Sequence, residues 1–198
     1  MDTAVDAAVI RARGNWLKSS FKDNEDVRLT IERDLSARLH GDVHVRILSL
    51  KEKALTTIYS APLGECIDAL DVTCSVYQVE PHYLVVADKK VEEILYSDLL
   101  KSNCLVTNQP DWGSVQIAYT GKQINREGLL KYLVSFRNHN EFHEQCIERI
   151  FVDMMQHCKP EKLTVYGRYT RRGGLDINPY RTTEKVSSQA LNVRLIRQ

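Results

Sequence analysis

Apolar residues recur along the chain at two periods, which predict a mixture of helices and strands. Over 23–39, 125–134 and 140–158 they return every third or fourth position, as one face of a helix requires. Over 42–50 and 114–119 they alternate with polar residues, which is typical of half-buried strands. The pattern thus predicts three helices and two strands in these five segments.

Shorter apolar runs and turn residues predict the remaining elements. Proline and glycine punctuate the chain at Pro62, Gly64 and Gly121, where we expect strands to end. The further elements expected on this basis are strands at 56–61, 71–79, 103–108, 163–170 and 192–196, a short helix at 90–100 and a turn at 109–111.

The ends of the two later helices carry capping signals. Asn125 is a suitable N-cap, with Glu127 in the first turn, where a negative charge stabilises the helix dipole. The polar break at 138–140 separates the two helices and leaves His139 outside the second one. Pro160 ends that second helix.

The order of the predicted elements indicates an α+β fold. From 103 onward it runs strand, strand, helix, helix, strand, strand, which favours an antiparallel sheet with two helices on one face. Residues 15–61, read as a helix and two strands, look like the second half of the same unit. We therefore predict a partial N-terminal module at 1–64 and a complete module at 65–198.

Composition narrows the class of protein. The 198 residues carry 27 basic and 26 acidic side chains, an even balance that argues against a nucleic-acid coat or a polybasic membrane binder. Five cysteines at irregular spacing do not make a disulfide framework and favour a reducing compartment. No apolar stretch is long enough to span a bilayer, and the acidic N-terminus does not resemble a secretory signal. We expect a cytoplasmic protein without membrane or direct nucleic-acid partners.

Residues 101–111 carry the most specific chemistry. Cys104 precedes Asp111 by seven positions across a Gln-Pro pair. A thiol is a soft nucleophile and a carboxyl group can carry a proton, so the two could add sulfur to an electrophilic carbon while protonating the neighbouring atom. For Asp111 to donate a proton near neutral pH, its pKa would have to be raised, by burial against Trp112 or by a nearby thiolate. An ordinary buried cysteine and a turn aspartate are the alternatives.

Two further segments carry candidate binding residues. His143 and Glu144 lie at the start of the second helix, where a carboxylate could accept hydrogen bonds from a guanine-like edge. His139 and His143 could instead bind zinc with Cys104. After the strand at 163–170, Arg172 and the amides of Gly173 could hold a phosphate, although an RNA-binding strand is an alternative.

Taken together, the motifs resemble one family, the NADPH-dependent 7-cyano-7-deazaguanine reductases of queuosine biosynthesis in tRNA modification, in their long two-module form. The resemblance runs from 15 to 198 and is dense from Val91 onward. The segments that carry it are 99–104, 109–114, 132–137, 139–146 and 169–179.

The resemblance implies a tunnelling fold, whose units assemble into barrels, so a homo-oligomer is expected. It implies an oxidoreductase that reduces a nitrile to a primary amine with two NADPH. The roles that it implies are Cys104 as the nucleophile that forms a thioimide, Asp111 as the proton donor, His143 and Glu144 as substrate contacts, and Arg172 and Gly173 as NADPH contacts. No resident metal is expected.

One departure from the family pattern affects the expected activity. Long-form members carry a Glu-Ser-Lys-Ser motif in the N-terminal module, which this sequence lacks. The resemblance therefore indicates a chain that begins inside that module, an N-terminally truncated form. Two alternatives stay open: a zinc-dependent hydrolase of a pterin or purine nucleotide on the same fold, and a catalytically inactive binding module.

Overall fold

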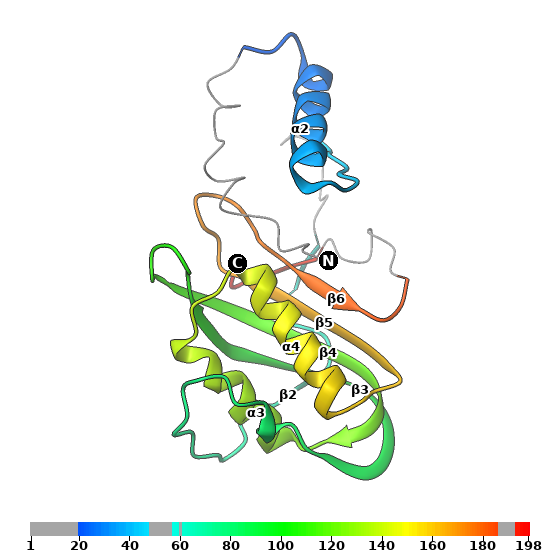
Figure 1. Cartoon of the computed structure of the whole chain (residues 1–198), viewed down its shortest axis with the longest axis vertical. Coiled ribbons are helices and arrows are strands. Elements are labelled where there is room, and N and C mark those ends of the chain that lie inside the picture. Colours follow the sequence, from blue (N-terminus) through cyan, green and yellow to red (C-terminus); the bar gives the residue numbers. More distant parts are fainter. Residues whose placement is uncertain (1–19, 48–56, 60, 186–192) are drawn as a thin grey trace. The chain divides into compact units, whose positions relative to one another are not determined.

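The computed structural model describes residues 20–47, 57–59, 61–185 and 193–198 of the chain (Figure 1). By its internal contacts the chain divides into two compact units, Met1–Leu55 and Thr56–Gln198. The predicted boundary between two modules, after residue 64, stays a prediction. The assignment of both modules to the tunnelling fold also stays a prediction.

The first unit contains one described helix, α2 (Asn24–Leu39), as predicted. Asp23 caps it by accepting a hydrogen bond from the amide of Asp26. The strand expected at 42–50 is wrong over its described part, because 42–47 pair with no other strand there. Instead, the amide of Val45 donates to Glu32 at 2.9 Å, which satisfies the backbone without a sheet.

The second unit is built on a five-stranded sheet in the order β2-β3-β4-β5-β6. All neighbouring pairs are antiparallel except β2, which runs parallel to β3. Strands β1 and β7 form a separate parallel pair. The strand bounds are β1 (Thr57–Tyr59), β2 (Glu65–Cys66), β3 (Val86–Asn103), β4 (Pro110–Ile124), β5 (Lys162–Tyr169), β6 (Tyr180–Thr182) and β7 (Val193–Leu195).

Two α-helices cover one face of this sheet, and Figure 1 shows α4 lying along it. The helical elements are η2 (Pro81–Tyr83), α3 (Arg126–Val134), η3 (Ser135–Asn138) and α4 (His143–His157). Asn125 caps α3 as predicted, by accepting from the amide of Gly128. Inward side chains of both helices, such as Leu133 and Ile147, share one core with alternate residues of β4, including Val115 and Ile117. The predicted α+β class, with an antiparallel sheet and two helices on one face, is confirmed.

The helix expected at 90–100 is wrong, because this segment lies inside strand β3. Its apolar residues are spaced irregularly since the pairing with β4 shifts register between Ser97 and Leu100. The shift lets both Leu95 and Leu100 point into the core although five positions separate them, and that spacing imitates a helix. Residues 71–79, expected as a strand, pair with none in the described structure.

The predicted boundaries around Cys104 are also wrong. Strand β3 ends at Asn103, so 103–108 is not a strand, and the turn expected at 109–111 is the start of β4. Pro110 is tolerated there because the first residue of a strand can do without an amide donor. Asp111 pairs in register with Ser102 and is thereby fixed on the sheet rather than on a mobile turn.

No helix in the described ranges is both long enough and apolar enough to cross a membrane.

Candidate active site

Cys104 lies at the beginning of a tight loop that joins β3 to β4. Its amide donates to the carbonyl of Gln109 at 2.8 Å, and its carbonyl accepts from the amide of Asn108 at 2.9 Å. Asn108 adopts the left-handed conformation, with φ of 55°, which asparagine tolerates better than most residues. Its side chain accepts from Asn140 at 2.7 Å. The loop is thus closed on itself and tied to the segment that precedes α4.

The thiol of Cys104 is buried but has polar neighbours. Its residue is 4% exposed. Burial acts to raise the pKa of the thiol, but hydrogen bonds from the hydroxyl and amide of Thr107 and from the amide of Val106 outweigh it. The charge of Asp111, like burial, acts to raise this pKa. The pKa of Cys104 therefore lies below its ordinary value, which favours the nucleophilic thiolate.

Asp111 is held as a buried carboxylate by His143 and Arg172. It is 4% exposed, its Oδ1 lies 3.0 Å from Nε2 of His143, and it pairs with Nε of Arg172. Burial acts to raise the pKa of Asp111, but the contacts with His143 and Arg172 outweigh it and hold the pKa below its ordinary value. The raised pKa that a resting proton donor needs is therefore not found, and Trp112 is itself 41% exposed.

His143 is the first residue of α4 and is almost fully buried, at 2% exposure. Its ring stacks on that of Tyr169, with centroids 4.1 Å apart, which fixes the plane of the imidazole. Within the described part of the chain, neither ring nitrogen has a hydrogen-bond partner, although Nε2 lies 3.0 Å from Asp111. A buried polar atom without a partner is costly, and such atoms at functional sites often serve a ligand.

Arg172 holds the start of β4 from the β5–β6 connection. Its guanidinium donates to Oε1 of Gln109 at 2.9 Å and to the carbonyls of Gln109 and Pro110 at 3.3 and 3.2 Å, in addition to the pair with Asp111. The next two residues, Gly173 and Gly174, have φ of 55° and 80°, and no atom lies within 4 Å of where a side chain would begin. This glycine turn is open to a ligand from outside.

The three residues of the zinc alternative play separate roles. Nε2 of His139 lies 2.7 Å from Glu141, whereas His143 faces Asp111. Glu141 also pairs with Arg149; burial acts to raise its pKa, but His139 and Arg149 together lower it to about 2. Among the residues that the structure describes, no three His, Cys, Asp or Glu side chains lie close enough to share a metal ion.

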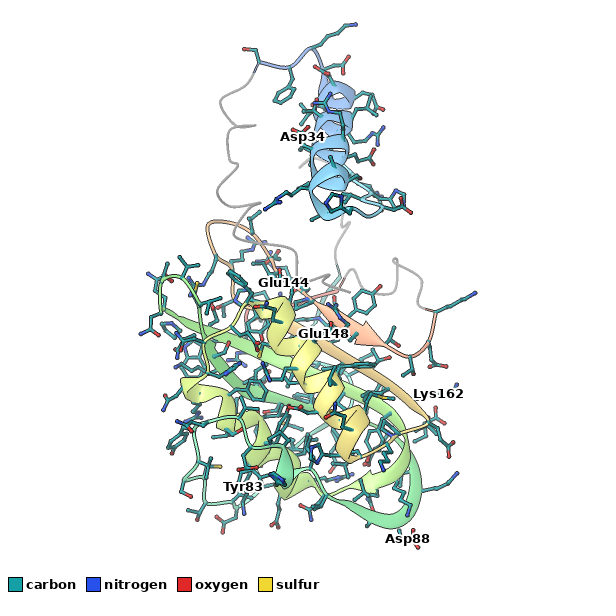
Figure 2. All side chains as sticks on the ribbon, viewed as in Figure 1. Asp34, Tyr83, Asp88, Glu144, Glu148 and Lys162 are labelled. Atoms are coloured by element: carbon teal, nitrogen blue, oxygen red, sulfur yellow. The ribbon has the colours of Figure 1, made fainter. Side chains whose placement is uncertain are left out.

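Glu144 follows His143 on α4 and is partly exposed. It lies at the start of the helix, one turn before Glu148 (Figure 2). Neither a hydrogen bond nor an ion pair of its carboxylate is found with the described residues. It is therefore available to a ligand that carries N–H donors.

The structure brings Asp111, His143 and Arg172 together from three segments that lie far apart in sequence, and Cys104 lies in the loop that leads into the strand of Asp111. Sequence reasoning noted Thr107 only as a polar neighbour of Cys104, and it gave no individual role to Gln109 or Tyr169, although both lie in the motif segments 109–114 and 169–179. Thr107 and Gln109 lay in a segment that was read as strand and turn, so their loop contacts could not be foreseen. Tyr169 was read only as part of a strand, and nothing in its neighbours signals stacking on a histidine.

Comparison with known proteins agrees with the resemblance seen in the motifs. Residues 110–188 match the family described as QueF-like protein. Over 91% of its length the chain is 65% identical to the NADPH-dependent 7-cyano-7-deazaguanine reductase of Legionella pneumophila (strain Paris). Over 89% of its length it is 52% identical to the enzyme of the same name from Azoarcus sp. (strain BH72). The chain spans 63% of the length of each of these relatives.

Proposed function

We infer that this chain, whose residues 110–188 match the family described as QueF-like protein, takes part in reducing the nitrile of 7-cyano-7-deazaguanine to the aminomethyl group, with Cys104 as the covalent nucleophile. This is the reaction of queuosine biosynthesis that the motifs imply. The observation that carries the proposal is a buried thiol in a closed loop that leads directly into β4, where Asp111 is a buried carboxylate held by His143 and Arg172.

The site accounts for the proton in the first step. The sulfur of Cys104 attacks the nitrile carbon, which forms a carbon–sulfur bond and leaves negative charge on nitrogen. Asp111 is ionised in this geometry, so it begins as the base: it accepts the thiol proton and then delivers it to the nitrogen. The product is a neutral thioimide, and Asp111 returns to the carboxylate form that His143 and Arg172 stabilise.

NADPH, when bound, supplies the hydrides, two of which are needed to reduce a nitrile to an amine. Cys104 leaves as a thiolate once the carbon has been reduced for the first time, and its lowered pKa makes it a good leaving group. The open turn at Gly173 would receive a phosphate of the cofactor. Arg172 would reach it only by exchanging contacts with the start of β4.

The substrate is held, in this proposal, by His143 and Glu144. The unpartnered Nδ1 of His143 would gain a hydrogen bond to the bound base. The carboxylate of Glu144, at the start of α4, would accept from the adjacent N–H donors of the deazaguanine edge. Because both residues belong to the first turn of one helix, their spacing relative to Cys104 is set by the fold.

We further propose that the chain acts in the cytoplasm as a homo-oligomer without direct contact to nucleic acid. A reducing compartment suits a reaction that needs a free thiol, and all five cysteines are free. The loop residues Leu105 and Val106 are exposed apolar side chains beside the nucleophile, and a second copy of the chain would exclude water there. Light scattering tests the oligomer.

The test of the proposal is the covalent adduct. Incubation with 7-cyano-7-deazaguanine alone should add the mass of one substrate to the chain, on the peptide that contains Cys104. Cys104→Ala should abolish the adduct, whereas Cys66→Ala, which removes an exposed cysteine outside the site, should leave it unchanged. Adduct followed by NADPH consumption supports the reductase. Adduct without consumption indicates a binding module, and absence of adduct refutes the covalent mechanism.

A further inference from the structure

The nitrogens of His143 do not by themselves fix the plane of its ring. Nε2 lies 3.0 Å from Oδ1 of Asp111, yet neither ring nitrogen has a hydrogen-bond partner among the described residues. An ion pair depends mainly on the distance between two charges, whereas a hydrogen bond also requires a favourable angle. The contact with Asp111 therefore leaves the orientation of the imidazole to be set by packing.

The ring of Tyr169 supplies that packing. Tyr169 is the last residue of β5 and is 0% exposed. Its ring stacks on the imidazole with centroids 4.1 Å apart and planes inclined by 24°. Aromatic pairs prefer defined arrangements, and a close stack of this kind resists rotation of either ring out of its plane. His143 is itself buried, so its imidazole cannot turn without losing this contact.

Two glycines make room for the Tyr169 ring and for the start of α4. Gly113 pairs with Tyr169 across β4 and β5, and a Cβ at Gly113 would lie 3.1 Å from Cδ1 of that ring. Gly167 precedes Tyr169 by two positions on the same face of β5, and a Cβ there would lie 2.6 Å from Cδ1 of Ile147. Ile147 follows His143 by about one turn of α4. The missing side chains thus allow helix, ring and sheet to pack closely at this point.

We propose that Tyr169 is a positioning residue that holds the imidazole of His143 in the orientation that binds the substrate. It acts through His143. The ring alone carries this role, because the hydroxyl of Tyr169 has no hydrogen-bond partner among the described residues. The inference rests on the proposed function, in which His143 contacts 7-cyano-7-deazaguanine, but the stack itself is a property of the free chain.

The experiment measures the rate of nitrile adduct formation by intact mass, at increasing concentrations of 7-cyano-7-deazaguanine. Tyr169→Leu removes the ring, so His143 adopts orientations that do not bind, and the half-saturating concentration should rise about tenfold, as for loss of one hydrogen bond. The rate at saturation should change by less than about threefold, because Arg172 still holds Asp111. Tyr169→Phe keeps the ring and should restore the wild-type curve.

Tyr132→Leu is the matched control. Tyr132 is also 0% exposed in the same core, but its ring meets Phe136 edge-on and does not stack on a histidine. This variant should lower the free energy of unfolding, as Tyr169→Leu does, and leave the half-saturating concentration unchanged. If Tyr169→Leu does not fold, Gly113→Ala takes its place, since the added methyl group displaces the Tyr169 ring. It should raise the half-saturating concentration about threefold.

NMR of the histidine ring protons in the free chain observes the stack without substrate. The ring current of residue 169 should shift the signals of His143 in the wild type and in Tyr169→Phe, and Tyr169→Leu should remove the shift. His143→Asn identifies these signals by their loss. A His143 signal that is the same in the wild type and in Tyr169→Leu overturns the inference.

Failure of the inference is distinct from failure of the reductase. If the wild type forms the adduct, but Tyr169→Leu leaves the half-saturating concentration unchanged or Tyr169→Phe does not restore it, the proposed function stands and the role of Tyr169 is refuted. If the wild type forms no adduct, the proposed function is refuted and this inference falls with it, even where the NMR shift is present.

Discussion

Cys104 and Cys146 are both buried cysteines of the same unit, yet their environments drive their thiols in opposite directions. Cys104 is 4% exposed in a loop, and Cys146 is 0% exposed on the core face of α4. Burial raises the pKa of Cys146 to about 12, although contacts with Tyr169 and Ser102 act to lower it. At Cys104 the donors of Thr107 and Val106 outweigh burial. The balance between desolvation and the donors that face the sulfur therefore sets the pKa of a cysteine, and it differs between these two thiols.

We expect the largest effect on the reactivity of Cys104 when the carboxylate of Asp111 is removed. Asp111→Asn keeps the size of the side chain but cannot accept the thiol proton, so formation of the nitrile adduct should slow by about 10²–10⁴-fold. Stopped reactions analysed by intact mass give the rate. Adduct formation at the wild-type rate would mean that Asp111 plays no part in the proton transfer.

The two cysteines should also differ strongly toward a simple alkylating reagent. In the native chain near neutral pH, Cys104 should react at a measurable rate and Cys146 should not, because only the former has appreciable thiolate. Peptide mapping after timed exposure to iodoacetamide measures both. After denaturation the two should react alike, and equal rates in the native chain would refute the comparison.

Arg172→Gln should weaken the folded state in a pH-dependent way. The folded pKa of Asp111 lies below its unfolded value, so this group stabilises the fold above the unfolded pKa, and that stability is lost as pH falls through the folded pKa. Removing Arg172 should bring the two pKa values closer, which lowers the free energy of unfolding at neutral pH by roughly 1–3 kcal/mol and makes the loss on acidification smaller.

Urea unfolding of wild type and Arg172→Gln at neutral pH and at acidic pH measures this difference. Arg171→Gln is the matched control, since Arg171 pairs with Asp176 on the surface of the same connection and not with Asp111. A difference between wild type and Arg172→Gln that does not change with pH would contradict the linkage to Asp111.

We expect the smallest effect when the hydrogen bond between the Cys104 loop and the segment before α4 is removed. Asn140→Ala removes the 2.7 Å bond to Asn108 and should destabilise the chain by about 1 kcal/mol. Alkylation of Cys104 should slow only slightly, because the donors to the sulfur stay within the loop. Strong slowing of Cys104 alkylation by Asn140→Ala would show that the segment before α4, and not the loop itself, organises the nucleophile.

The helices on the sheet were predictable because their signals are local. The cap at Asn125 and the core stripe of α4 lie within the segments they define, and both predictions are confirmed. Strand β3 was misread as helix because a shift in its pairing with β4 changes the spacing of buried residues. Such a shift depends on the partner strand and leaves no mark in the segment itself.

Motifs in the sequence identified the candidate site residues, but they did not predict which of these residues contact one another. The sequence offered Cys104 and Asp111 as neighbours, and the structure has them at the start of the β3–β4 loop and at the start of β4. It gave no sign that His143 and Arg172 both meet Asp111, because these contacts join β4 to α4 and to the β5–β6 connection. That pairing reverses the expected state of Asp111, from a resting acid to a resting carboxylate.

The central claim is that the sulfur of Cys104 bonds the nitrile carbon. NMR of 7-cyano-7-deazaguanine labelled with an NMR-active isotope at that carbon, mixed with the chain in the absence of NADPH, observes the bond directly. We predict that the nitrile signal is replaced by a thioimide signal in the wild type and persists with Cys104→Ala. A nitrile signal that stays unchanged in the wild type, or a thioimide signal that survives in Cys104→Ala, would contradict the account.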